Sequence, residues 1–172
     1  VDYSLLLLVL SSAGLADASV TDAMYDALDS SIHIIPEGAG PVKVLGVDPG
    51  TMATGYGVVQ ATGIRTFQLV ECGVIRPDRE APLAERLRQV HEDLAALLAR
   101  HRPEVLAVEE AFLAVNVRTT LVLGQARGVI LLAGAQAGVA LAEYSPAEIK
   151  KAVTGRGQAL KPQVGFMVAQ LL

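Results

Sequence analysis

Two short apolar runs that each lead directly into a carboxylate place the strongest constraint on the fold. Residues 44–47 (Val-Leu-Gly-Val) lead into Asp48, and residues 105–108 (Val-Leu-Ala-Val) lead into Glu109. The second run is apolar at every position, as expected of a strand buried on both faces in the centre of a sheet. The pattern predicts two central strands whose ends carry acids.

The segments around these runs predict one ordered α/β domain from residue 42 onward. Residues 42–47, 54–60 and 65–75 have the turn-bounded pattern of an antiparallel three-strand meander. From Pro82 the apolar residues recur at helical spacing, which predicts an amphipathic helix that covers the sheet. The elements expected after Glu109 are a strongly apolar and therefore buried helix from Asn116 to about Gln136, a strand near 139–143, a helix at 146–153 and a helix from about Pro162.

Residues 1–41 differ from the rest of the chain in charge and are predicted to be an N-terminal extension. They contain six acids and no Lys or Arg, whereas the remainder contains 14 basic and 12 acidic residues. The formal net charge of −4 therefore comes from the extension, and a nucleic acid stays open as a partner of the remainder. The apolar stretch at 5–10 lacks a basic leading region and is too short to span a bilayer, so no membrane is expected as a partner.

The cysteine and histidine content argues against several other kinds of site. The single cysteine, Cys72, excludes an internal disulfide and agrees with a reducing compartment; we expect it to be a small buried strand residue. His91 and His101 are expected to face solvent or to lie near a helix end, not to bind metal. No His-Cys spacing typical of zinc, no nucleophile elbow and no Walker loop is present.

Asp48 and Glu109 are the candidate metal ligands. The order of elements (three strands, helix, strand, helix) places the first and fourth strands side by side, with their ends roughly 5 Å apart. Two carboxylates at that separation repel each other, which raises a pKa or recruits a hard cation such as Mg²⁺ or Mn²⁺. The tight turn at 49–51 (Pro-Gly-Thr) exposes backbone amides that suit either a phosphate or a simple chain reversal.

Four segments in this order resemble the RuvC family of Holliday junction resolvases. They are residues 44–51 (VLGVDPGT), 54–59 (TGYGVV), 108–112 (VEEAF) and 123–128 (LGQARG). The resemblance covers roughly residues 42–172 and includes Lys150 and a Gly-rich turn that leads to Lys161. It implies an RNase H-like three-layer α/β fold with a mixed five-stranded sheet flanked by helices, and a homodimer.

The resemblance also implies a function: a structure-selective, Mg²⁺-dependent endonuclease that resolves four-way DNA junctions in recombination and repair. It implies a branch-migration helicase complex as a further partner, and a cytoplasmic location or an organelle of bacterial origin if the extension is a targeting segment. In the family four acids hold two Mg²⁺ ions, and Asp48 and Glu109 match two of them. The other two follow the position of Leu172, so the domain at 42–172 is expected to be truncated at its C-terminal helix; residues 17–29 are an alternative source of acids.

Five further residues are candidate DNA contacts. Phe112 follows Glu109 by three residues, where an aromatic side chain could wedge against an unstacked base or simply plug the local hydrophobic core. Basic residues predicted to contact phosphates are Arg118, Lys150, Arg156 and Lys161, of which Lys150 and Lys161 best match the family's basic positions. Each could also be an ordinary solvated side chain.

Two alternative functions stay open. Without the further acids, the chain could be a catalytically inactive RuvC-like protein retained for binding or assembly. The turn at 48–51 (Asp-Pro-Gly-Thr) also resembles that of actin, Hsp70 and sugar kinases. Those proteins enclose ATP between two domains, whereas this chain has room for one domain and lacks a second Gly-rich phosphate turn.

Overall fold

The structure, a computed structural model, describes residues 41–63, 66–110, 117–160 and 163–164. The predicted helix cap Asn116 and most of the predicted helix from Pro162 lie outside these residues. The described elements are β1 (Val42–Asp48), β2 (Thr54–Gly63), β3 (Thr66–Ile75), α3 (Leu83–His101), β4 (Val105–Glu109), α4 (Val117–Ala137), β5 (Ala140–Tyr144) and α5 (Pro146–Thr154).

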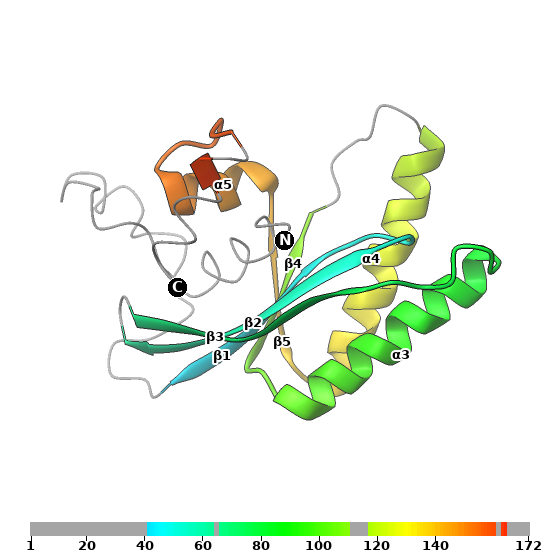
Figure 1. The fold of residues 1–172 in the computed structure, drawn as a ribbon, viewed down its shortest axis with the longest axis horizontal. Helices are drawn as coiled ribbons and strands as arrows, with labels where there is room; N and C mark the ends of the chain where they lie inside the picture. Colours follow the sequence, from blue (N-terminus) through cyan, green and yellow to red (C-terminus); the bar gives the residue numbers. More distant parts are fainter. Residues whose placement is uncertain (1–40, 64–65, 111–116, 161–162, 165–172) are drawn as a thin grey trace.

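The five strands form one mixed sheet in the order β3-β2-β1-β4-β5. β1, β2 and β3 pair in the antiparallel sense, while β4 is parallel to both β1 and β5. Helices α3 and α4 cover one face and α5 covers the other, which gives three layers (Figure 1). The predicted meander and the mixed five-stranded sheet flanked by helices are therefore confirmed.

Local sequence signals set the ends of two helices. In α5, Ser145 and Glu148 form a capping box, in which the Ser145 hydroxyl accepts from the Glu148 N–H and the Glu148 carboxylate accepts from the Ser145 N–H. Gly155 ends that helix in the left-handed conformation. Arg102 ends α3 in the same conformation, and its N–H donates to the carbonyl of Leu98.

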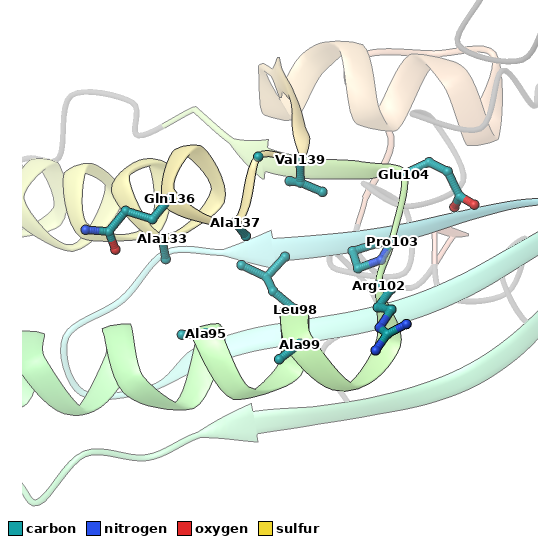
Figure 2. A pocket seen from close by; sticks show the side chains of 11 residues that line it. Ala95, Leu98, Ala99, Arg102, Pro103, Glu104, Ala133, Gln136, Ala137 and Val139 are labelled. Carbon is teal, nitrogen blue, oxygen red and sulfur yellow. The ribbon is translucent and has the colours of Figure 1, made fainter.

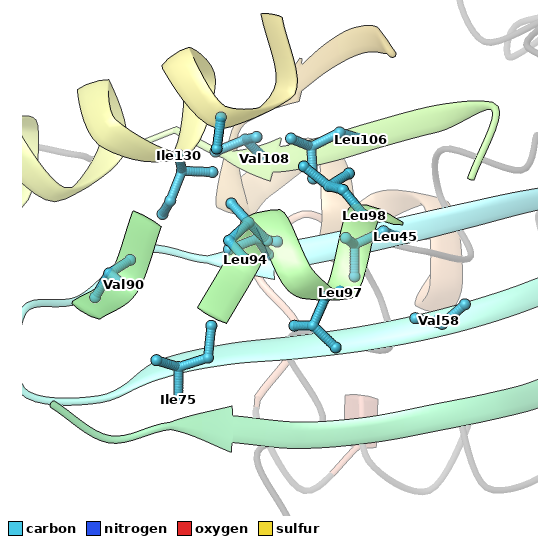
Figure 3. Packing of buried hydrophobic residues seen from close by; sticks show 12 residues of the cluster. Leu45, Val58, Ile75, Val90, Leu94, Leu97, Leu98, Leu106, Val108 and Ile130 are labelled. Atoms are coloured by element: carbon cyan, nitrogen blue, oxygen red, sulfur yellow. The ribbon is translucent and has the colours of Figure 1, made fainter. Parts of the chain in front are cut away.

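The core has two parts because the strands are buried on both faces. On one side, Leu45, Leu94 and Leu106 belong to a cluster between the sheet and helices α3 and α4, and all three are fully buried (Figure 3). On the other side, Val44 and Ala107 pack with Ile149 of α5. Leu45 and Val44 are neighbours in sequence, so the strand alternates between the two parts of the core.

The prediction that α4 is a buried helix is wrong for one side of the helix. Only Ala126, Ile130, Ala133 and Gly134 are buried, whereas Val117, Leu121 and Leu132 are 76%, 64% and 51% exposed. Within the described residues, α4 is also the one helix long and apolar enough to span a membrane by length and composition. Its buried side packs on the sheet and on α3, and its other side is an uncovered apolar surface.

Cys72 is exposed, contrary to the prediction that it is buried. It lies on β3, which is an edge strand of the sheet. The neighbouring outward residues Val70 and Val74 are 41% and 42% exposed, so this face of β3 is not covered by the described helices. A β-branched, apolar strand sequence predicts pairing but does not tell an edge strand from a central one.

A cavity of about 660 Å³ opens between the C-terminal ends of α3 and α4. Leu98 of α3 and Arg102, which follows that helix, line one side, and Gln136 of α4 and Val139, which follows that helix, line the other (Figure 2). Glu104, which also lines it, directly precedes β4, so the cavity lies at the end of the sheet opposite to the carboxyl ends of β1 and β4. The cavity is therefore separate from Asp48 and Glu109.

A polar cluster ties the end of α3 to β3. Glu71 accepts hydrogen bonds from Tyr56 Oη (2.7 Å) and Arg100 (2.7 Å), and its second oxygen lies 2.9 Å from His101 Nε2. His101 lies at the helix end as predicted, but its side chain is only 10% exposed and does not face solvent. The hydrogen bond from Tyr56, followed by those from His101 and the charge of Arg100, holds the pKa of Glu71 below its usual value.

We expect this cluster to make stability depend on pH. The pKa of Glu71 is lower in the folded protein than in the unfolded chain, where it is about 4.3. The contribution of Glu71 to the free energy of unfolding is therefore complete above that unfolded value and is lost as the pH falls through the pKa of the folded state. Glu71→Gln should lower the free energy of unfolding by about 1 kcal/mol at pH 7 and by less at pH 3.5, measured by urea unfolding. Glu80→Gln, which alters an exposed carboxylate, is the control; equal losses at both pH values would contradict the linkage.

Candidate active site

The sheet brings the two predicted metal ligands together. Val47 of β1 is paired with Val108 of β4 in the parallel register, and the next residues are Asp48 and Glu109. Adjacent strands lie about 4.8 Å apart, so the two carboxylates leave the sheet at neighbouring positions. The antiparallel pairing of Asp48 with Gly55 of β2 places a residue without a side chain on its other flank.

Both acids point toward the same face of the sheet. Leu45 and Val47 contact the cluster under α3 and α4, whereas Val44 contacts α5, so alternation directs Asp48 toward the α5 side. The same reasoning applies to Glu109, because Ala107 packs on the α5 side and Val108 on the other. Both acids are partly buried, and each has interaction partners. The pair can therefore present oxygen ligands to one cation.

A tight turn after Asp48 fixes the end of β1. Gly50 N–H donates to Thr54 Oγ1 at 3.3 Å, and the same hydroxyl donates to the Gly50 carbonyl, so the turn is closed on itself. Thr51 and Thr54 are both buried. A Cβ at Gly50 would lie 2.2 Å from the Ala53 carbonyl oxygen, which is a backbone atom. Only glycine fits this position without opening the turn.

Gly50→Ala should therefore displace the turn that positions Asp48. We expect a loss of about 1 to 3 kcal/mol in the free energy of unfolding, because the clash is with backbone and not with a flexible side chain. The family resemblance implies cleavage of four-way junctions, and with Asp48 as a metal ligand that cleavage should fall at least tenfold, since small displacements at a catalytic centre are costly. Thermal melting and single-turnover cleavage measure the two effects, and a variant that matches the parent protein in both would show that the turn tolerates a side chain.

Tyr144 and the start of α5 form the other side of the site. Tyr144 is the β5 partner of Glu109, and its carbonyl accepts a hydrogen bond of 2.8 Å from the Glu110 N–H. Burial, followed by the charge of Glu148, raises the pKa of Tyr144 to about 12. A tyrosine hydroxyl is protonated at neutral pH even without this shift, and it carries one O–H donor. The sequence pattern did not single out Tyr144, because its closeness to Glu109 depends on the β4–β5 register.

The predicted basic residues occupy both faces of the sheet. Lys150 lies in α5 and Arg156 follows it, whereas Arg118 lies in the first turn of α4 on the opposite face. Arg118 and Arg156 are exposed. α4 ends where β5 begins, beside the start of β4, so its first turn lies toward the carboxyl ends of the strands. Arg118 and Lys150 thus belong to two helices that both begin toward that end, and Arg156 follows the second of them.

Two candidate DNA contacts, Phe112 and Lys161, lie outside the described residues. The same is true of the alternative acids at 17–29. Within the described ranges, no group of three or more His, Cys, Asp or Glu side chains is placed to hold a metal ion. The described part of the chain therefore supplies two acids of a candidate metal centre.

Residues 44–172 match the family described as crossover junction endodeoxyribonuclease RuvC. A protein of that name from Azorhizobium caulinodans is 50% identical over 133 residues, which cover 77% of this chain and 78% of the relative. A second, from Pelotomaculum thermopropionicum, is 52% identical over 129 residues, which cover 75% and 78%.

Solved structures agree with this match. The structure of T. thermophilus RuvC in complex with Holliday junction substrate superimposes with a TM-score of 0.72 at 35% identity, covering 76% of this chain and 79% of that one. The yeast mitochondrial Holliday junction resolvase Ydc2 shares the fold, with a TM-score of 0.53 at 14% identity over 98% of this chain and 94% of that one. The predicted RNase H-like fold is confirmed by these neighbours.

Proposed function

The chain belongs to the RuvC family of crossover junction endodeoxyribonucleases, and we propose that Asp48 and Glu109 are the acids with which it cleaves DNA. Its activity is the resolution of four-way (Holliday) junctions by an endonuclease. The observation that carries the proposed site is the parallel pairing of Val47 with Val108, which puts the two acids side by side on one face. The predicted family and activity are confirmed.

Members of this family depend on a metal, and the donor set suits a hard cation. Two carboxylates supply the oxygen ligands that Mg²⁺ and Mn²⁺ prefer. We assign Mg²⁺, or Mn²⁺ in its place, to Asp48 and Glu109. A pair of ions needs more anionic ligands, so two ions require acids from outside the described residues, for which 17–29 hold four aspartates (Asp17, Asp22, Asp26 and Asp29).

A bound cation of this kind activates water and offsets charge on the leaving oxygen. Asp48 and Glu109 would hold such a cation: β1 and β4 set the separation of the two acids, and the turn closed by Thr54 follows Asp48 directly. Tyr144, protonated at neutral pH beside Glu109, can donate a hydrogen bond to a carboxylate or phosphate oxygen.

Binding of junction DNA is proposed to use the basic residues at the same end of the molecule. The RuvC neighbour from T. thermophilus is a complex with Holliday junction substrate, which supports junction DNA as the ligand of this chain. We propose that Arg118, Lys150 and Arg156 contact phosphates, each contributing to the salt dependence of binding. Phe112 and Lys161 stay predicted contacts.

The uncovered side of α4 supports the proposed homodimer. Val117, Leu121, Gly124, Gly128 and Leu132 recur at spacings of four or three residues and form one stripe, here called the α4 stripe. An added Cβ at either glycine would meet nothing within 4 Å, so neither glycine is required by packing within the chain. Glycine inside a helix costs about 1 kcal/mol relative to alanine, which suggests that another helix approaches there.

A second copy of this chain is the proposed occupant of the α4 stripe. Two copies related by a twofold axis would place α4 against its symmetry mate through the same residues. The resulting dimer carries two active sites, which matches a four-way junction in which two strands must be cut. A helicase partner and a cytoplasmic location stay predictions from the family.

An inactive, junction-binding protein is the second candidate function. It is favoured by the absence, within the described ranges, of a third acid beside Asp48 and Glu109. The ATP-handling alternative has no support from the family match, which spans residues 44–172.

The deciding experiment combines the full chain with a synthetic four-way junction, a linear duplex of the same sequence, and Mg²⁺ or EDTA. We expect symmetric cuts in the junction but not in the linear duplex, and only when Mg²⁺ is present. Binding to the junction without cuts at any Mg²⁺ or Mn²⁺ concentration would favour the inactive protein. Equal cutting of the linear duplex would contradict structure selectivity.

A further inference from the structure

Arg86 is a partly buried cation beside the turn that follows Asp48. It lies near the start of α3, and one of its terminal N–H groups donates to Met52 Sδ. Its Nε is buried and has no hydrogen-bond partner. Met52 belongs to the turn between Asp48 and β2, so the guanidinium group lies against the catalytic end of the sheet.

The surroundings of Arg86 do not satisfy its charge. A thioether sulfur is a weak acceptor, and a guanidinium has five N–H donors. Arg88, two residues away on the same helix, differs sharply because it pairs with both Glu85 and Glu92. Among the described residues Arg86 has no acidic partner. Its place near a helix N-terminus adds no stabilisation, because the helix dipole is positive there.

Two more arginines lie at this end of the sheet. Ile75, the last residue of β3, pairs with Thr54 at the end of the same turn, and Arg76 follows it directly. Arg79 lies in the connection from β3 to α3. Both side chains are exposed and have no ion pair with a described residue. Arg76, Arg79 and Arg86 thus form a basic group around the turn, away from α5 and its Lys150.

We infer that Arg86 binds a backbone phosphate of the DNA strand held at Asp48 and Glu109, with Arg76 and Arg79 as outer contacts of the same strand. This inference rests on the proposed function, because it takes the acid pair as the place of cleavage. A phosphodiester supplies the anionic oxygens that Met52 cannot, and guanidinium groups match phosphate geometry through paired N–H donors. The strand is then held from both sides of the site.

A purely structural role for Arg86 predicts a different result. Its aliphatic stem could simply cover Met52 and hold the turn, in which case the charge would not matter. Arg86→Met keeps an unbranched apolar stem and removes the charge, and Arg86→Lys keeps the charge and removes the planar fork. Arg88→Met is the matched control, because it removes a neighbouring arginine whose charge is already paired.

The test measures binding of a fluorescent four-way junction by the full chain, in EDTA, over a series of salt concentrations. Arg86→Met should weaken binding about tenfold at 0.1 M salt. It should also make the negative slope of log K against log salt shallower by about 1. Arg86→Lys should keep most of the slope. Arg88→Met should bind as the parent protein does. Single-turnover cleavage with Mg²⁺ should fall at least tenfold for Arg86→Met alone.

An unchanged salt slope for Arg86→Met would overturn the inference, whether or not its melting temperature falls; a lower melting temperature with that slope would assign Arg86 to packing. A shallower slope for Arg86→Met, together with a parent protein that does not cleave, would support phosphate binding by Arg86 and contradict the proposed catalysis. A parent protein that cleaves, together with an Arg86→Met variant that binds and cleaves equally well, would support the proposed catalysis and contradict phosphate binding by Arg86. A chain that does not bind the junction at all would overturn both.

Discussion

Replacing Asp48 by Asn should reduce the single-turnover rate of junction cleavage roughly 10³-fold or more. The substitution keeps the size of the side chain and removes one negative charge from the acid pair at the ends of β1 and β4. A loss of about 4 kcal/mol in transition-state stabilisation corresponds to that factor, and several kcal/mol is the usual contribution of a metal ion to such a reaction. Glu109→Gln should have a similar effect.

Measuring junction binding separates the proposed catalytic role of Asp48 from a general loss of structure. Junction affinity in EDTA should not weaken in Asp48→Asn, because the variant has one negative charge fewer near the DNA phosphates. Glu110→Gln is the matched control: Glu110 follows Glu109 directly but is exposed and lies beyond the end of β4. Cleavage by Asp48→Asn at the rate of the Glu110→Gln control would rule out Asp48 as a metal ligand in catalysis.

The sequence predicted the acid pair because the relevant signals are local. Residues 105–108 have no polar side chain, which identifies a central strand without knowledge of its neighbours. After the meander and the helix that follows Pro82, the next strand has few places where it can join the sheet. β4 lies beside β1, as expected. The structure added the shared face of Asp48 and Glu109, since that depends on the strand register.

Properties that depend on distant neighbours were not accessible from the sequence. Cys72 has the surroundings of a buried strand residue in the sequence, yet β3 is an edge strand and exposes it. In the sequence, Arg86 and Arg88 are both charged residues of the same amphipathic helix. Only the structure distinguishes them, because Arg86 contacts Met52 whereas Arg88 pairs with two glutamates. Tyr144 is close to Glu109 only through the pairing of β5 with β4.

The apolar character of α4 illustrates the same limit and leads to the second large effect. Its composition predicted burial, but the described chain buries only one side, and the exposed side is where we propose that a second copy binds. Placing glutamate at both Leu121 and Leu132 should convert the proposed dimer to a monomer. Each substitution removes apolar area from the α4 stripe and, in a twofold interface, brings like charges close together.

We expect the dissociation constant of the dimer to rise by at least about 10³-fold, from the combined loss of four leucine contacts across the twofold axis. Sedimentation or light scattering over a concentration series measures the change. Leu69→Glu, which alters a leucine on β3 that is 40% exposed, controls for the added charge and should leave the dimer intact.

The variant designed to be monomeric also tests whether paired cutting requires two active sites. Its acid pair, the turn at Gly50 and the cations of α5 are unaltered, so it should still nick a junction strand, but the paired, symmetric cuts should be replaced by single nicks. A double variant that stays dimeric would place the interface elsewhere on the molecule. A parent protein that stays monomeric on the junction and still makes paired cuts would contradict the dimer itself, because one active site would then be cutting both strands in turn.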